Sequence, residues 1–417
     1  MEVARERSEP PARPVAGGRL LAVDAARTVA IVGMMAVHLA GEAADSWGAL
    51  DWPSGFAAGG FAVLAGVSLG LTHRLRRPGW RPWAGQLARS ALLFALGVGL
   101  AEISQGPVVI LCVYAALFAV ALPLRRLPPR VLLALGLVGT VVLPLVSYGL
   151  RTWLLDDPGM LRAVPPDYAV EWRTLTGEDA AVRVARTLLL DGIYPLLAWL
   201  PLALAGWGAY GVGLLRPERL GRLALVACAL LALGFGGAAL VERVTHVRAE
   251  AIAEVADAVP AALRGDRSPA ELVDRGNGLP RVTGIDALLL AGHHTGTTLE
   301  LWRILGVTAA FVVAFAALAR VVPAAVAVAG WPGRIPLTVY STHIAVGWVL
   351  VNGGLPEELT PTQEVVLLAA EVAAAFVLGA AYRGRRGPLE AVLAAVSRLA
   401  GGAAPARVRS AAAGPGP

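Results

Sequence analysis

Three ionisable residues, Asp24, Arg27 and His38, lie in the apolar stretch VDAARTVAIVGMMAVHLAG at residues 23–41. Ionisable groups are expensive to place in hydrocarbon, and within a membrane helix they usually line a polar path. At about 100° per residue, Arg27 and His38 point within roughly 20° of one another, and Asp24 lies about 40° from the same line. The spacing therefore predicts one polar stripe, along which Arg27 and His38 stand about 16 Å apart.

This stripe combines a base with a group that binds anions. The His38 imidazole could deprotonate an amine or a hydroxyl, because the unperturbed pKa of His lies near neutrality. Arg27, with Asp24 beside it, is a candidate ligand for a phosphate-bearing substrate, since a guanidinium group matches phosphate and carbonyl oxygens. The alternative is structural: Asp24 and Arg27 are spaced i,i+3 and could neutralise each other, while His38 reaches the membrane interface.

A second cluster, GHHTGTTLE at residues 292–300, precedes another apolar run. Free N–H groups at a helix start favour an anion or a developing oxyanion, so His294 and Glu300 are catalytic candidates. His293 is better explained as an interfacial residue at a capped helix start. Adjacent histidines point about 100° apart on a helix, so we expect no metal site here.

The segment LTVYSTHIAV brings Tyr340 and His343 to one helix face at a spacing of i,i+3. They could line the path of a bound donor, or they could simply hydrogen-bond a neighbouring helix. Glu371 is a further carboxylate within an apolar run, and we expect it to pair with an arginine such as Arg303.

The composition requires a membrane. Hydrophobic residues make up 56% of the 417 residues and charged residues only 16%, which is too apolar for one soluble core. All 36 basic residues are arginines, spread over connecting segments, so the net charge of +6 does not indicate nucleic-acid binding. Cys112 and Cys228 fall in apolar runs and form neither a disulfide framework nor a metal motif. We expect an all-α polytopic membrane protein.

Apolar runs of about 20 residues predict ten transmembrane helices. The connecting segments alternate between basic and acidic or mixed, and the basic ones belong on the cytoplasmic side, so both termini should be cytoplasmic. The transmembrane domain would cover 19–392, between a disordered segment 1–18 and a cytoplasmic tail 393–417. The long segments 151–191 and 243–295 would be external, the second with an amphipathic helix near 246–264. The predicted spans are 20–40, 55–73, 86–102, 106–124, 130–150, 192–215, 222–242, 296–320, 334–352 and 363–382.

Four segments carry a family resemblance: RLLAVDAARTVAIVGMMAVHLA, HHTGTTLELWRILG, GRIPLTVYSTHIAV and RGPLEAVL. Together they resemble the bacterial branch of the heparan-α-glucosaminide N-acetyltransferase-like membrane family. The Arg27-x10-His38 spacing is also similar to the first-helix signature of the acyltransferase-3 family. The resemblance implies transfer of an acyl group from cytosolic acyl-CoA to an acceptor across the membrane. The animal enzyme has a catalytic His in its first external loop; here the segment 41–55 has none, so His38 and His294 become the candidates.

We therefore expect an acyl-CoA-dependent acyltransferase of the plasma membrane, with acetyl-CoA or another acyl-CoA as donor substrate. Its acceptor would be an extracytoplasmic amine or hydroxyl, on a sugar or glycan, and the chain could form a homodimer. The competing hypothesis is a transporter or channel whose polar stripe conducts a small solute or protons. Transporters often contain inverted repeats, and the two halves of this chain lack convincing internal symmetry.

Overall fold

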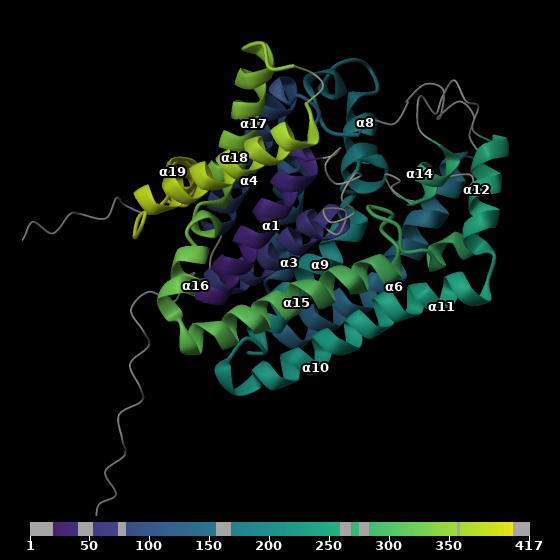
Figure 1. Ribbon diagram of the computed structural model, residues 1–417, viewed down its shortest axis with the longest axis horizontal. Coiled ribbons are helices and arrows are strands. Elements are labelled where there is room, and N and C mark those ends of the chain that lie inside the picture. Colours follow the sequence, from purple (N-terminus) through teal and green to yellow (C-terminus); the bar gives the residue numbers. More distant parts are fainter. Residues whose placement is uncertain are drawn as a thin grey trace, which may run out of the picture.

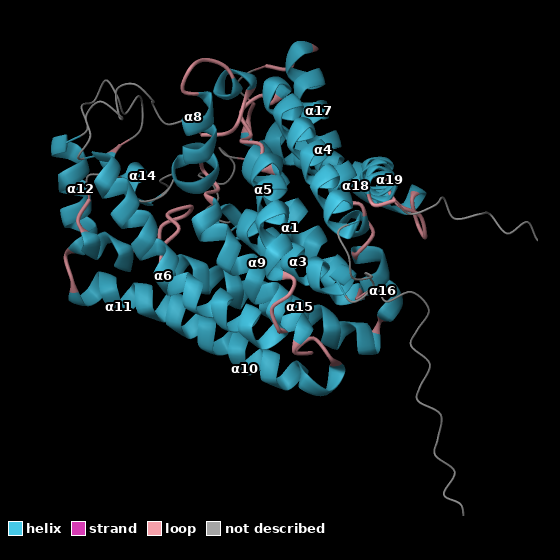
Figure 2. Ribbon diagram, turned by 180° about the vertical axis from the view of Figure 1, so that it is seen from behind, coloured by secondary structure: helices cyan, strands magenta, loops and turns pink. Residues whose placement is uncertain are grey.

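The computed structural model describes residues 20–40, 53–73, 81–155, 168–258, 268–274, 283–356 and 359–402. Throughout these ranges the backbone forms helices and connecting loops, without any strand (Figures 1 and 2). Seven segments are long and apolar enough to cross a membrane, which confirms the expected multi-pass, all-α class. They are α1 (Leu21–Leu39), α3 (Pro53–His73), α4 (Arg81–Ile103), α6 (Pro129–Leu155), α10 (Leu220–Leu231) continued through η4 (Ala232–Gly236) into α11 (Gly237–Val244), α15 (Thr298–Val321) and α18 (Pro361–Ala381).

Three shorter helices occupy the remaining predicted spans: α5 (Leu111–Leu124), α9 (Leu196–Gly211) and α17 (Pro336–Asn352). Every predicted apolar span therefore contains a helix, and within the described residues seven helical segments reach the length of a membrane crossing. Most of α5 and α9 is buried by neighbouring helices. A helix packed inside the protein needs less apolar length than one that faces lipid along its whole course.

Helix α9 lies at the centre of the bundle, where it packs most extensively against α6 and α3. The crossing of α3 and α9 depends on two glycines. A Cβ atom at Gly66 would collide with the backbone of Ala203, and one at Gly206 would collide with the backbone of Val63. Small residues let membrane helices approach closely, so the Gly- and Ala-rich composition serves this backbone contact.

The molecule has two distinct ends (Figure 1). At one end, α16 (Pro323–Ala329) packs on α1, and α19 (Pro388–Ala400) packs on α4 and α17. Helix α19 crosses the domain boundary predicted at residue 392. At the opposite end, α12 (Val247–Ala258) packs on α14 (Pro269–Asp274). The segment before α9 holds η1 (Trp172–Leu175), α8 (Ala180–Arg186) and η2 (Thr187–Asp191).

A salt bridge ties α12 to α14. Arg248 donates to both carboxylate oxygens of Asp274, at 2.9 Å from Nε and 2.5 Å from Nη2. This hydrogen bonding holds the pKa of Arg248 above its usual value. Helix α12 covers the first part of the predicted amphipathic helix at 246–264, and the part after residue 258 lies outside the described residues.

Candidate functional site

Helices α1, α3, α4, α5, α17 and α19 enclose a cavity of about 890 Å³, here called the main cavity. Its volume lies within the range of roughly 300–1,000 Å³ that small-molecule and cofactor sites occupy. Arg27 and His38 both line it, so helix geometry brings the two ends of the predicted stripe to one cavity. Its two ends differ in chemistry.

Arginines dominate the end of the main cavity beside α19. Glu390 is the only carboxylate among the described lining residues, and it is held by the start of α17. Its Oε1 accepts from the backbone N–H groups of Leu337 at 2.8 Å and Thr338 at 3.1 Å. The mouth is therefore cationic and suited to phosphate groups. The lining arginines are Arg27, Arg89, Arg334, Arg386 and Arg398.

Arg27 fits both hypotheses drawn from its spacing. Its Nη1 donates to Asp24 Oδ1 at 2.6 Å, and its Nη2 donates to Ser68 Oγ at 2.7 Å, while the residue still lines the main cavity. Asp24 is buried, lies 3.6 Å from Arg334 through its other oxygen, and is absent from the described cavity lining. The structure thus places Asp24 behind Arg27, as its anchor, and not against a ligand in the cavity.

Tyrosines and apolar residues line the other end of the main cavity, beside His38. Tyr114, Tyr194 and Tyr340 all contribute to the wall and are largely buried. The Tyr340 hydroxyl accepts from the backbone N–H of Ile110 at 3.2 Å, which fixes α17 to the start of α5. An aromatic and apolar end of this kind suits a small uncharged group at the tip of a ligand.

A second hollow of about 220 Å³ adjoins this end, here called the second hollow. Ser104, Gln105 and Glu364 supply polar groups to its wall, together with apolar residues of α17 and α18. His38 lines both this hollow and the main cavity, whereas His343 lines the second hollow alone. The His38 side chain therefore lies where two separate hollows meet.

His38, His343 and Glu371 form a line of hydrogen bonds across three helices. His38 Nδ1 lies 3.0 Å from His343 Nε2, and His343 Nδ1 lies 2.5 Å from Glu371 Oε2. The two imidazole rings are nearly coplanar, with planes 8° apart and centroids separated by 5.3 Å. The prediction that Glu371 pairs with Arg303 is wrong, because Arg303 instead donates to the backbone oxygens of Gly234 and Ala291.

The His294 and Glu300 cluster has a different geometry. The buried Glu300 carboxylate accepts from the backbone N–H of His294 at 2.5 Å, the backbone N–H of Gly296 at 2.6 Å and the Thr295 hydroxyl at 3.3 Å. His294 has a φ of 60°, a left-handed conformation that costs energy for a residue with a side chain. These bonds fold the loop before α15 around Glu300.

Neither of these two residues lines the main cavity. Both border a void of only about 10 Å³, and the His294 ring packs edge-on against Tyr194 with centroids 5.5 Å apart. His294 therefore supports the cavity wall from behind through Tyr194. Their proposed catalytic roles stay predictions, and this geometry favours a structural role for Glu300.

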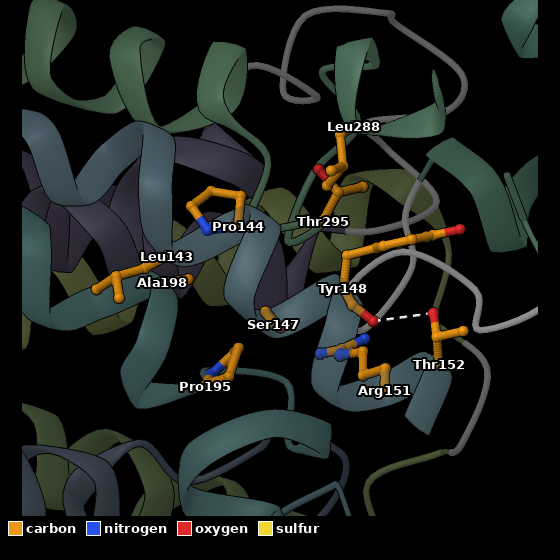
Figure 3. Close-up of a pocket in the computed structure, with 11 residues that line it drawn as sticks. Leu143, Pro144, Ser147, Tyr148, Arg151, Thr152, Pro195, Ala198, Leu288 and Thr295 are labelled. Carbon is orange, nitrogen blue, oxygen red and sulfur yellow. Dashed lines mark hydrogen bonds between the residues drawn. The ribbon is translucent and has the colours of Figure 1, made fainter. Parts of the chain in front are cut away.

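A small pocket between α6, α9 and the same loop is drawn in Figure 3. Tyr148, Arg151, Thr152 and Thr295 are among the residues that line it, and the buried Arg151 donates to the Leu190 backbone oxygen. Its volume of about 20 Å³ accommodates about one water molecule. This pocket is too small for a substrate.

Sequence reasoning missed the cavity residues that come from other helices. Arg386 precedes α19 and Arg398 lies on it. The basic charge of this region indicates the cytoplasmic side of the membrane, but by itself it does not indicate a cavity. Arg89 on α4 lies over the Phe118 ring at 5.6 Å, a contact that no spacing in the sequence suggests. Among the described residues, no group of three or more His, Cys, Asp or Glu side chains could hold a metal ion.

The chain matches no protein-family model, and no curated protein matches it. Its function must therefore be argued from the two hollows and the side chains between them.

Proposed function

We propose that this protein is a membrane-bound acyltransferase that moves an acyl group, such as acetyl, from cytosolic acyl-CoA to an acceptor on the opposite side of the membrane. One observation carries the proposal: the His38 imidazole borders both the main cavity and the second hollow. A donor in the first and an acceptor in the second would meet at this ring. The resemblance to the heparan-α-glucosaminide N-acetyltransferase-like family supports the same reaction.

The donor would enter past α19. The phosphate groups of acyl-CoA match the arginines at this mouth, with Arg386 and Arg398 exposed at its surface and Arg334 deeper in the cavity. Its pantetheine arm would pass Arg27, and the thioester would end among the tyrosines beside His38. This arrangement follows the gradient of the cavity from cationic to apolar.

Acyl transfer needs a base at the point where the two substrates meet. As the acceptor nitrogen or oxygen attacks the thioester carbonyl carbon, His38 takes the proton that this atom loses. The C–S bond then breaks, the acyl group stays on the acceptor, and the thiolate of CoA takes the proton from His38. The reaction balances without a metal or a redox partner.

The proposal includes ten membrane spans, with α19 and both termini on the cytoplasmic side of the plasma membrane. The α12 and α14 end would then face outwards, and the second hollow would receive an extracytoplasmic acceptor. Ser104, Gln105 and Glu364 in its wall suit a hydroxyl- or amine-bearing molecule such as a sugar. A cysteine replacing Ser268, at the start of α14, should react with an impermeant thiol reagent on intact cells.

The direct test is thiol release from acetyl-CoA by the purified protein in vesicles, with a panel of amino sugars and polyols as acceptors. We expect release with at least one acceptor, and loss of release in His38→Gln. His246→Gln is the matched control, because His246 is exposed just before α12 and is not among the described residues that line either hollow. Absence of acetyl-CoA binding, with no thiol release by any acceptor, would contradict the proposal and favour a transporter.

A further inference from the structure

We infer that His343 and Glu371 are positioning residues that fix the His38 imidazole with its proton on Nδ1 and its lone pair on Nε2. The inference rests on the proposed function and deepens it, because it assigns the atom of His38 that takes the acceptor proton. It also assigns a task to a buried carboxylate that the acyl-transfer scheme leaves unused.

An ionised Glu371 can only accept hydrogen bonds. His343 must then carry its proton on Nδ1 to donate across the 2.5 Å contact with Glu371 Oε2. A neutral imidazole with a proton on Nδ1 has its lone pair on Nε2, so His343 accepts at that atom. Across the 3.0 Å contact, His38 is therefore the donor through Nδ1, and its own lone pair is left on Nε2.

The ring geometry supports this chain of donors. An N–H···N bond is strongest when the lone pair and the N–H bond lie in the planes of both rings. The His38 and His343 planes differ by only 8°, and their centroid separation of 5.3 Å is that of rings joined edge to edge. Among the described residues, no hydrogen-bond partner is found for His38 Nε2, the atom that remains for substrates.

Glu371 can offset the positive charge that His38 acquires during the reaction. When His38 takes a proton at Nε2, an imidazolium forms in a site where an isolated charge is costly. His343 is buried and links this positive charge to the negative charge of Glu371 through two hydrogen bonds. A buried carboxylate that faces a neutral histidine is costly by itself, so the presence of Glu371 beside His343 is better explained by the base that it serves.

The test is ¹⁵N NMR of histidine-labelled protein in detergent, with the His38 signals assigned by their loss in His38→Gln. The protein has six histidines, so the spectrum is tractable. In the wild type we expect His38 to be protonated at Nδ1 and unprotonated at Nε2. In Glu371→Gln we expect loss of this preference, and a wild-type signal protonated at Nε2 would overturn the inference. Once the His38 signals are assigned, the wild-type measurement does not depend on the folding of Glu371→Gln.

Kinetics provide a second readout that a purely structural role would not change. Because a wrong tautomer disables the base, Glu371→Gln should lower kcat by roughly 10²-fold while the KM for acetyl-CoA stays within about twofold. Glu371→Asp should recover part of the rate, and Glu218→Gln, an exposed residue outside both hollows, should match the wild type. An unchanged kcat in well-folded Glu371→Gln would contradict the inference. If the wild type transfers no acyl group, the proposed function fails, and the NMR spectrum still decides the tautomer.

Discussion

Two clusters in this protein combine histidine with a buried glutamate, and they differ in what the carboxylate contacts. Glu371 bonds to a side chain, His343, and through it reaches an imidazole that borders two hollows. Glu300 bonds to the backbone N–H groups of its own loop and lies beside a void too small for a substrate. A carboxylate that satisfies backbone amides shapes a loop, whereas one that bonds to a histidine can tune a base.

The largest expected effect is a loss of acyl transfer when the histidine of the first cluster, His38, is replaced, but not when His294 of the second cluster is replaced. His38→Gln should lower acyl transfer by about 10²–10⁴-fold, the usual contribution of a general base, with little change in thermal stability. His294→Gln should keep most of the transfer rate, because His294 lies behind Tyr194. Thiol release and thermal unfolding of both variants check this. Comparable losses of transfer in the two variants would remove the distinction between the clusters.

Changes in the Glu300 cluster should affect stability more than activity, the opposite of the expectation for His38. Glu300→Gln replaces one acceptor oxygen by an NH₂ group facing backbone donors, so it should lower the free energy of unfolding by about 1–3 kcal/mol. The transfer rate per folded molecule should stay near the wild-type value. Unfolding monitored by tryptophan fluorescence measures this change, with Glu218→Gln as the control. A stable variant that has lost transfer would return Glu300 to the catalytic candidates.

The cationic mouth should affect binding of the donor but not the chemical step. Arg386→Gln and Arg398→Gln should each raise the KM for acetyl-CoA about tenfold, or about 1.4 kcal/mol, with kcat unchanged. The neighbouring Arg385 is exposed and does not line the main cavity, so Arg385→Gln is the matched control. With S-acetylpantetheine, which has no phosphate, all three variants should behave like the wild type. An effect that persists with this donor would argue against phosphate recognition.

Replacing both members of the Asp24–Arg27 pair should have only a small net effect on stability. Arg27→Gln alone removes a positive charge beside the buried Asp24 carboxylate, so it should lower the melting temperature. It should also weaken acetyl-CoA binding. Adding Asp24→Asn should restore most of the stability, since replacing both partners of a buried pair is often nearly neutral, while binding stays weak. Melting temperature and acetyl-CoA affinity of both variants decide this. Wild-type affinity in the stable double variant would exclude Arg27 as a donor ligand.

Local periodicity was sufficient to place Arg27 and His38 on one face of a helix, because a helix places residues by spacing alone. The structure adds that both residues line the main cavity. It could not predict the partner of Glu371, since His343 lies 28 residues away on another helix and only packing brings the two together. The sequence also could not predict that Glu300 binds the backbone of its own loop or that Asp24 lies behind Arg27, because both depend on contacts formed in the fold. For the same reason, the arginines that line the main cavity belong to four separate chain segments and become one site only in the fold.

In the proposed function, His38 stands between a cytosolic donor and an acceptor from the other side of the membrane. Electron cryo-microscopy of the wild-type protein with acetyl-CoA tests it most directly. We predict density in the main cavity, with the nucleotide beside Arg386 and Arg398 and the thioester next to His38. Density for the donor outside this cavity, or a thioester far from His38, would contradict the account.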